Sequence, residues 1–224
     1  KAPKKMKNYR LFLIATLCLF VLGISAQVPE KGVSKELAQQ RKANISNVSY
    51  DLTFNIPADA KTAVTGKAII TFDLLQKNDV VFDFQGGFSG TCTVNGKKKR
   101  QATYKHDHIL LAAKLLKQGI NVVEIDFAST NKALNRQKDY MYTIFLPDQA
   151  HSAFPCFDQP DIRARFTTTL TVPEGWKGMF SDGANPIPTY LYSFVAGKFE
   201  EKAAVRDGYP IRALYRETDA KKVD

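Results

Sequence analysis

The strongest constraint on the fold is a strict alternation of apolar and polar residues between positions 48 and 56. The apolar positions are Val48, Tyr50, Leu52, Phe54 and Ile56, and the residues between them are polar. Because successive side chains of a β-strand point to opposite faces, this period of two predicts a half-buried strand. Turn-type residues follow at 57–61, and a second alternation over 67–74 predicts a partner strand.

Further strand patterns recur about every ten residues, with turn signals such as Gly86-Gly87 and Asn95-Gly96 between them. We expect these strands at 80–84, 92–94, 108–111, 122–127, 140–146, 165–172, 190–199 and 211–215. The one extended helical pattern covers residues 34–43. This order predicts an all-β, mostly antiparallel β-sandwich preceded by a short helix, not a βαβ sheet.

The first 26 residues have the three-part pattern of a secretory signal peptide. Basic residues at 4, 5, 7 and 10 precede an apolar run over 11–24, and Ser25-Ala26-Gln27 supplies small residues for cleavage after Ala26. The apolar run is shorter than the roughly 20 residues that span a membrane. We therefore expect an exported protein, periplasmic, extracellular or on the cell surface, with membrane contact only through an uncleaved leader.

The net charge of +10 does not by itself indicate nucleic acid, because half of the surplus lies in the leader. In the rest of the chain the basic residues are scattered, which is typical of a soluble surface. One exception is the run Lys97-Lys98-Lys99-Arg100 after the Asn95-Gly96 turn. Such a run favours a solvated loop that protects a sheet edge, and contact with an anionic partner is the alternative.

Residues that could perform chemistry are few. Cys92 and Cys156 are the cysteines beyond the leader, and the sequence leaves open whether they pair. His106 and His108 lie at a spacing that metals use, but an exposed hairpin is the simpler interpretation. The sequence contains no His-Glu-x-x-His zinc helix, Gly-x-Ser-x-Gly elbow or Gly-rich phosphate loop. We therefore assign no catalytic and no metal-binding residue.

The most informative segment is a rigid loop before the strand at 165–172. Its central residues are Pro155, Cys156, Phe157, Asp158, Gln159 and Pro160, preceded by Phe154. The two prolines fix φ and remove backbone donors, so the segment is not a ladder-forming strand. Asp158 is placed to accept hydrogen bonds from backbone amides, and the two phenylalanines to anchor the loop in a core.

This loop, followed by Val172-Pro173-Glu174-Gly175-Trp176, closely resembles the N-terminal domain of aminopeptidase N-like zinc metallopeptidases, the gluzincin aminopeptidases. Three weaker stretches agree in order: 47–52, the alternation from Leu115 to Phe127, and 188–199. The resemblance implies a saddle-like β domain that packs on a catalytic domain and helps to wall its substrate pocket. It places the loop 155–160 at the interface between the two domains.

The resemblance also implies that the zinc ligands, the general base and the peptide-gripping Gly-x-Met-Glu-Asn loop belong to a following domain that this sequence does not include. The chain alone is then expected to be inactive, with zinc in the absent catalytic domain. The implied partners are that catalytic domain and, through the parent enzyme, peptide substrates, with no nucleic acid. The implied organisation is a leader at 1–26, a lead-in with a short helix at 27–46, the β domain at 47–215 and the start of a connection at 216–224.

Two departures from the family pattern stand out. Ile144 and Leu146 occupy positions where many members have polar groups that approach the substrate amine, so no substrate-binding residue is carried over. The segment 179–186 is also short for the hairpin that usually lies there. The alternative function that we retain is a stand-alone exported β-sandwich module that binds a glycan or a protein, since a β fold alone does not define function.

Overall fold

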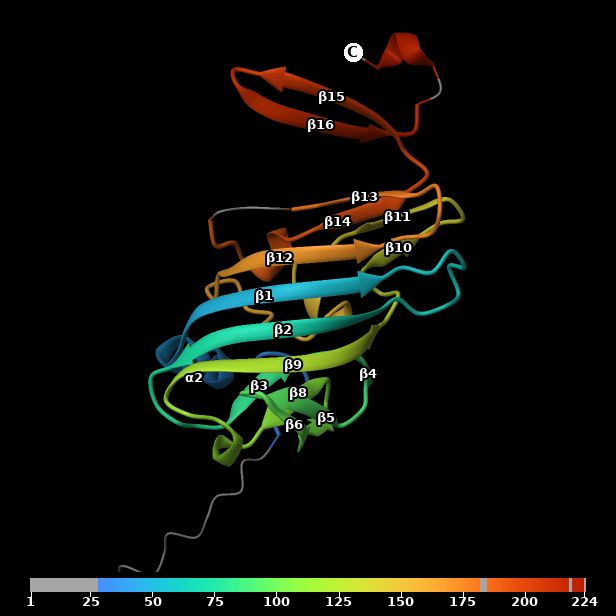
Figure 1. Ribbon diagram of the computed structural model, residues 1–224. Coiled ribbons are helices and arrows are strands. Elements are labelled where there is room, and N and C mark those ends of the chain that lie inside the picture. Colours follow the sequence, from blue (N-terminus) through green and yellow to red (C-terminus); the bar gives the residue numbers. More distant parts are fainter. Residues whose placement is uncertain (1–27, 182–184, 218, 224) are drawn as a thin grey trace, which may run out of the picture.

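The computed structural model describes residues 28–181, 185–217 and 219–223 (Figure 1). The expected leader at 1–26 lies outside these residues, as do three residues of the short segment 179–186. In the part of the chain that the structure describes, no helix has the length and apolar character needed to cross a membrane.

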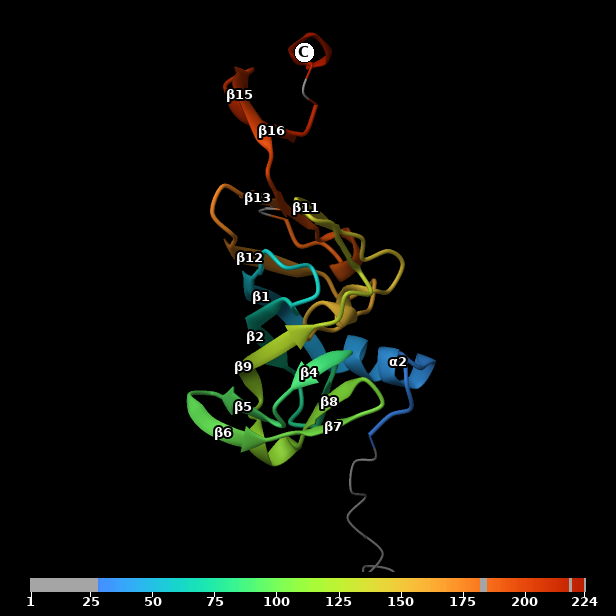
Figure 2. The ribbon, with the colours of Figure 1, turned by 90° about the vertical axis from the view of Figure 1, so that its right-hand side faces the viewer.

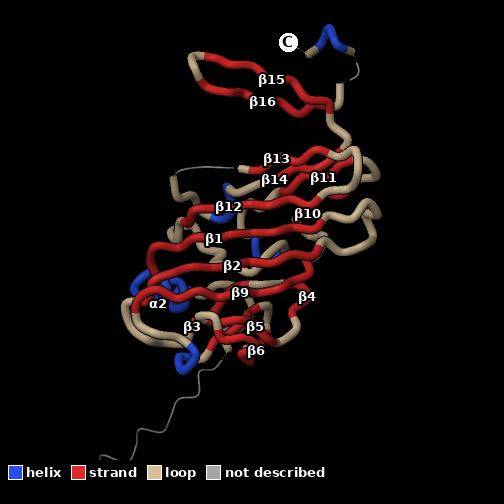
Figure 3. Tube along the Cα trace, in the orientation of Figure 1, coloured by secondary structure: helices blue, strands red, loops and turns tan. Residues whose placement is uncertain are grey.

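Strands dominate the described residues, and the largest sheet has seven of them (Figures 1 and 3). Its path runs β12 (Ala164–Thr171), β1 (Ile45–Asn55), β2 (Thr65–Leu74), β9 (Gly119–Ser129), β5 (Thr91–Val94) and β6 (Lys97–Gln101), and β4 (Gly86–Phe88) also pairs with β9. Neighbouring strands are antiparallel except β1 and β12, which run parallel. The prediction of a mostly antiparallel all-β fold is confirmed.

Three smaller sheets complete the described fold. One has the order β3 (Val80–Asp83), β8 (His108–Leu111), β7 (Thr103–Lys105), and another the order β10 (Leu134–Arg136), β11 (Tyr140–Thr143), β14 (Phe194–Gly197), β13 (Lys177–Phe180). The last is the hairpin β15 (Glu200–Arg206) and β16 (Tyr209–Tyr215), which stands apart at one end (Figures 1 and 2). Short 3-10 turns lie at Ala113–Leu115, Ala150–Ser152, Thr189–Leu191 and Ala220–Lys222.

The helix α2 (Lys35–Asn44) confirms the helical prediction, and its buried Leu37 packs with Val81 of β3 and Leu110 of β8. Ser34 caps it, because its Oγ accepts a hydrogen bond from the backbone N–H of Leu37 at 3.2 Å. Only Leu37 and Arg41 of the helix are buried. A helix with one aliphatic and one charged side chain in the interior is therefore attached by charge as well as by apolar contact.

Aromatic rings fill the core between the sheets. Phe54 of β1 lies 4.6 Å from Phe194 of β14 between ring centroids, and Phe154 packs edge-on against Phe54, Phe145 and Tyr192. All five rings are at most 2% exposed. Offset and edge-to-face rings add to the free energy of simple apolar burial, so this cluster is the main tie between the loop before β12 and the sheets.

Two predicted strands are too long. The strand expected at 140–146 ends at Thr143, and Pro147 beyond it has no N–H to continue a ladder. The strand expected at 190–199 begins only at Phe194. Its first part is a 3-10 turn after Pro188, in which Tyr192 N donates to Thr189 O at 3.1 Å. The alternation of aromatic residues there reflects burial in a turn, not a strand.

The histidine segment also differs from the prediction of an exposed hairpin. His106 and Asp107 form the turn between β7 and β8 with φ of 54° and 61°. His108 begins β8 and is only 1% exposed. The two imidazoles therefore do not share an open metal-binding face.

Candidate functional site

The predicted rigid loop, residues 154–160, is embedded in the domain. Phe154, Cys156 and Phe157 are fully buried, and Asp158 and Gln159 are 6% and 4% exposed. Phe157 packs against Phe72 and Phe82 with centroid distances of 5.7 and 4.8 Å. The expectation that the phenylalanines anchor the loop in a core is confirmed.

Backbone hydrogen bonds attach the loop to β3. Asp83 N donates to Cys156 O at 2.7 Å, and Cys156 N donates to Asp83 O at 3.1 Å. One residue on, Phe157 N donates to the phenol oxygen of Tyr50 at 2.9 Å. The loop is thus held by the same donors and acceptors that a strand would use, although its prolines prevent a continuous ladder.

A buried charge cluster lies beneath this bridge. Asp83 accepts two hydrogen bonds from Arg41 of α2, Nη2 to Oδ1 at 2.7 Å and Nη1 to Oδ2 at 2.8 Å. The backbone N–H of Asp158 donates to the same carboxylate at 2.8 Å, and His108 Nδ1 lies 3.0 Å from Oδ1. Asp83 therefore joins the helix, the strand β8 and the loop at one point.

Burial raises the pKa of Asp83, but the charge of Arg41 and the contacts with His108, Arg41 and Asp158 N outweigh it and lower the pKa to about 2. For His108, burial lowers the pKa, yet the contact with Asp83 raises it above its ordinary value. His108 Nε2 also faces the carbonyl oxygens of Glu30 and Gly32 at 3.0 and 3.1 Å. Acceptors on both ring nitrogens favour the protonated imidazole.

A second acid–base pair lies on the other side of the loop. Asp158 Oδ2 is 2.8 Å from His151 Nδ1 and accepts a hydrogen bond from His151 N at 3.0 Å. Thr189 Oγ1 donates to Asp158 Oδ1 at 2.7 Å. Burial lowers the pKa of His151, and the hydrogen bond with Asp158 raises it to a net value above the ordinary one. The expected role of Asp158 as a local acceptor thus extends to a histidine and to the turn at 189–191.

The six residues predicted to lie at a domain interface differ in their exposure. Pro155, Cys156, Phe157, Asp158 and Gln159 are buried against this domain, and only Pro160 is exposed. A cavity of about 430 Å³ opens beside Pro160. Its lining also includes Lys31, Lys132, Asp148 and His151. The interface role stays a prediction, and Pro160 with the mouth of this cavity is the part of the motif that a neighbouring domain can reach.

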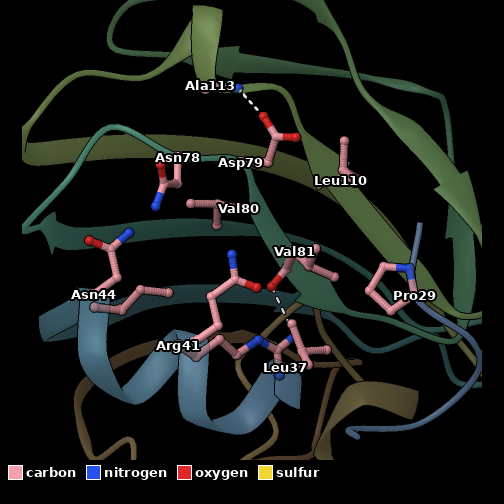
Figure 4. Close-up of a pocket in the computed structure, with 12 residues that line it drawn as sticks. Pro29, Leu37, Arg41, Asn44, Asn78, Asp79, Val80, Val81, Leu110 and Ala113 are labelled. Carbon is pink, nitrogen blue, oxygen red and sulfur yellow. Dashed lines mark hydrogen bonds between the residues drawn. The ribbon is translucent and has the colours of Figure 1, made fainter. Parts of the chain in front are cut away.

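A second cavity, of about 630 Å³, lies between α2 and the strands β3 and β8 (Figure 4). Several of its polar groups have partners within the chain. Arg41 Nη2 donates to Val81 O at 2.9 Å, and Asp79 Oδ1 accepts from Ala113 N at 2.6 Å. We assign this cavity to the packing of the helix on the sheet.

Cys92 and Cys156 are free and buried, so they do not form a disulfide with each other in this structure. Burial together with the charges of Asp158 and Asp83 holds the pKa of Cys156 well above its ordinary value, and burial raises that of Cys92 to about 11. Since the thiolate is the reactive form, neither thiol is suited to be a nucleophile. Within the described ranges, no group of three or more His, Cys, Asp or Glu side chains could hold a metal ion.

Sequence reasoning missed the Arg41–Asp83–His108 cluster. One signal was available: Asp83 stands inside the apolar stretch Val80–Phe84, and a carboxylate within a buried strand requires a cationic partner. Its partners could not be identified in advance, because Arg41 lies 42 residues away on a helix.

The apolar side chains expected to replace the polar groups of the family, Ile144 and Leu146, are 49% and 56% exposed. Tyr142 on β11, at 39%, and Leu191, at 52%, are also large exposed apolar residues. Tyr142, Ile144 and Leu146 lie at every second position along the segment from β11 toward Pro147. The exposed side of this segment is therefore apolar.

Comparisons with known proteins found a matching family profile and two related sequences. The sequence profile of the peptidase M1 N-terminal domain matches residues 125–184, which include the loop 154–160. Aminopeptidase N of Streptomyces lividans is 29% identical over 173 residues, 72% of this chain and 20% of that protein. Leucine aminopeptidase 2-1 of Scheffersomyces stipitis is 26% identical over 182 residues, 71% of this chain and 29% of that protein.

Solved structures with a similar fold include an M1 zinc metallopeptidase and a leukotriene A4 hydrolase. A mutant of the M1 zinc metallopeptidase from Deinococcus radiodurans, bound to a Tyr-Ser-Ala substrate, superimposes with a TM-score of 0.64 at 18% identity. The match covers 77% of this chain and 48% of that one. Leukotriene A4 hydrolase from Saccharomyces cerevisiae gives 0.57 at 20% identity, covering 71% and 30%.

The fold, the loop and these matches define a β domain of the kind found in M1 metallopeptidases. Residues 125–184 match the M1 N-terminal domain, and the fold of the described residues resembles that of an M1 zinc metallopeptidase. The chain spans between a fifth and a third of the length of the two aminopeptidases that it matches.

Proposed function

We propose that this chain is the N-terminal, non-catalytic domain of an exported zinc-dependent aminopeptidase, in which it braces the catalytic domain and forms one wall of the substrate pocket. The observation that carries the proposal is the match of residues 125–184 to the M1 N-terminal domain. The aminopeptidases that match the chain extend well beyond it. Zinc and the residues that activate water would belong to a catalytic domain, because the described residues offer no cluster that fits a metal.

The hairpin β15–β16 supports a docking role. It is a two-stranded sheet on its own, and nearly all its residues are exposed, including Val205 at 73% and Tyr209 at 75%. Isolated two-stranded hairpins are marginal in water, and three strands or a packed face are needed for independent stability. A neighbouring domain that covers the hairpin would supply that packing.

The exposed apolar segment at Tyr142, Ile144 and Leu146 supports the role of a pocket wall. Ile144 and Leu146 occupy the family positions that approach the substrate amine, and their exposed side chains offer apolar surface without a hydrogen-bond acceptor. We infer that the wall selects substrates by apolar contact with the first side chain more than by recognition of the amine. Water would be displaced from this wall when substrate binds, which strengthens polar interactions elsewhere in the pocket.

The test is to express the complete coding sequence that continues this chain and to measure release of N-terminal residues from peptides. We expect zinc-dependent activity that a chelator removes, and no activity from the 224-residue chain alone. In the complete enzyme, Leu146→Gln should change KM for substrates with different first residues, whereas Leu75→Gln, at an exposed leucine between β2 and β3, should not. A complete product that binds no zinc and cleaves no peptide would refute the proposal.

Export is tested separately. Mass spectrometry of the protein recovered from its native host should show an N-terminus at Gln27, if the leader is removed after Ala26. Recovery of the intact leader from the soluble cytoplasmic fraction would refute export without affecting the assignment of the domain.

A further inference from the structure

The strand β6 is an open, uniformly basic edge. In the described part of the chain, it forms the end of the seven-stranded path and pairs with β5 alone, and all five of its residues are exposed. Four of them are the cations Lys97, Lys98, Lys99 and Arg100. The strand lies at the opposite end of the molecule from the hairpin β15–β16 (Figures 1 and 2). It is therefore separate from the surface that the proposed function uses.

These four charges are not neutralised by this domain. Other surface cations do have partners, as when Lys198 lies 2.9 Å from Asp139 and Arg212 lies 2.7 Å from Glu201. Among the residues that the structure describes, no carboxylate oxygen lies within 4.0 Å of the cationic groups of 97–100. Glu124 is two strands away, opposite Thr93 of β5, at roughly 10 Å by strand spacing.

A bulge concentrates the charge. Cys92 pairs with Arg100 and Val94 with Lys97, so Thr93 alone is opposed by both Lys98 and Lys99. Lys99 has a φ of 52°, a left-handed conformation that is strained for a residue with a side chain and that glycine adopts freely. A single lysine would suffice to keep a strand edge from self-association. The additional cations, one of them in a strained position, indicate a surface with a partner.

A groove of about 550 Å³ follows this strand and the residues after it. Lys99 and Arg100 line it together with Lys114, which adds a fifth cation, and Leu115 adds apolar surface. A free strand edge offers backbone N–H and C=O groups that another extended backbone satisfies and that a phosphate or sulfate polymer does not. Strand geometry and charge together therefore favour a peptide over a polyanion.

We propose that β6 and this groove bind an acidic, extended peptide segment of a partner protein, which adds to the seven-stranded sheet as a further strand. The ladder of hydrogen bonds holds the peptide backbone, and Lys97, Lys98, Lys99, Arg100 and Lys114 select carboxylates along it. The five residues of β6 match a strand of about 17 Å in the partner.

The test is fluorescence anisotropy with the full 224-residue chain and a labelled eight-residue probe of alternating Glu and Val. The wild-type chain should bind it, with an affinity that falls as salt is raised. A probe of the same sequence with N-methyl groups on alternate amides keeps the charge and loses the ladder. It should bind about tenfold or more weakly, the loss expected for several missing hydrogen bonds.

The decisive variant is Lys98→Glu with Arg100→Glu, which should weaken binding by about tenfold or more through charge reversal at short range. The matched control is Lys77→Glu with Lys138→Glu, at two exposed lysines that do not line the groove, and it should bind like the wild type. Lys99→Gly removes one charge and relieves the left-handed strain. It should bind more weakly while its thermal midpoint rises, which excludes misfolding as the cause.

Equal binding of the N-methylated and plain probes would overturn the proposal in favour of a polyanion surface, as would stronger binding of polyphosphate than of the peptide. Equal weakening by the control pair would overturn it as well, because the effect would then come from net charge alone. The proposal does not depend on the parent enzyme, so its failure leaves the aminopeptidase assignment untouched.

Discussion

Replacement of Arg41 by methionine tests how the helix α2 and the rigid loop are held together. The Arg41 side chain is 2% exposed, and methionine keeps most of its length. The change removes the guanidinium, which makes two hydrogen bonds to Asp83 and one to Val81 O. The variant leaves Asp83 with His108 as its remaining cationic neighbour.

The expected loss is large because the pair is buried. Breaking a buried ion pair by removing one partner costs about 3–5 kcal/mol, most of it from the charge that remains. The lowered pKa of Asp83 gives an independent figure. Its fall from 3.8 to about 2 corresponds to about 2 kcal/mol of folding free energy at neutral pH. We therefore expect Arg41→Met to lower the free energy of unfolding by about 3 kcal/mol or more, a sizeable part of the 5–15 kcal/mol typical of a domain.

The assay is urea unfolding of the full chain at pH 7, followed by circular dichroism. Lys35→Met on the first turn of the same helix is the matched control, since Lys35 is exposed, and it should stay within about 0.5 kcal/mol of the wild type. The double variant Arg41→Met with Asp83→Asn should recover part of the loss, because it no longer buries a charge. An unchanged urea midpoint in Arg41→Met would refute the reasoning.

The Arg41–Asp83 pair also makes the free energy of unfolding depend on pH in the acid range. A carboxylate whose folded-state pKa is lowered stabilises the fold above its ordinary pKa, and this contribution is lost as the pH falls toward the folded value. For Asp83 that window runs from about pH 4 to about pH 2. The wild-type chain should lose stability across it more steeply than Arg41→Met, in which the pKa of Asp83 is less depressed.

Three further results are expected. Because the pKa of His151 is raised in the folded state, its bond with Asp158 stabilises the fold below about pH 6.5. This stabilisation is lost as the pH rises through the folded pKa. In urea titrations at several pH values, Asp158→Asn should therefore reduce the dependence of the unfolding free energy on pH in this range. Cys92 and Cys156 should resist alkylation at pH 7.5 in the folded chain and react in urea, as mapped by mass spectrometry, because burial raises both pKa values. Gly66→Ala should lower the thermal midpoint by several degrees, since a Cβ there would clash with a backbone carbonyl of the neighbouring strand, and a normal midpoint would contradict that packing.

The local patterns of the sequence were sufficient for most of the strands and for the helix. The alternation over 48–56 and over 67–74 is a direct consequence of strand geometry, and β1 and β2 are where it predicts them. The prediction was wrong at 190–193, where the same alternation of aromatic residues lies in a turn. Burial on alternate residues arises in both cases, so the pattern alone does not distinguish them.

The candidate site divides in the same way. The sequence was sufficient to predict the rigid proline-containing loop at 155–160, its resemblance to a metallopeptidase domain and its anchoring phenylalanines. These features depend on backbone restriction and residue type within one short stretch of consecutive residues. Only the tertiary structure decided that Arg41, Asp83 and His108 meet beneath that loop, since each comes from a different element and their attraction acts across space. The open basic edge at β6 is likewise a property of the sheet order. The four consecutive cations can be read from the sequence, but only the structure shows that no further strand of the described residues pairs with β6.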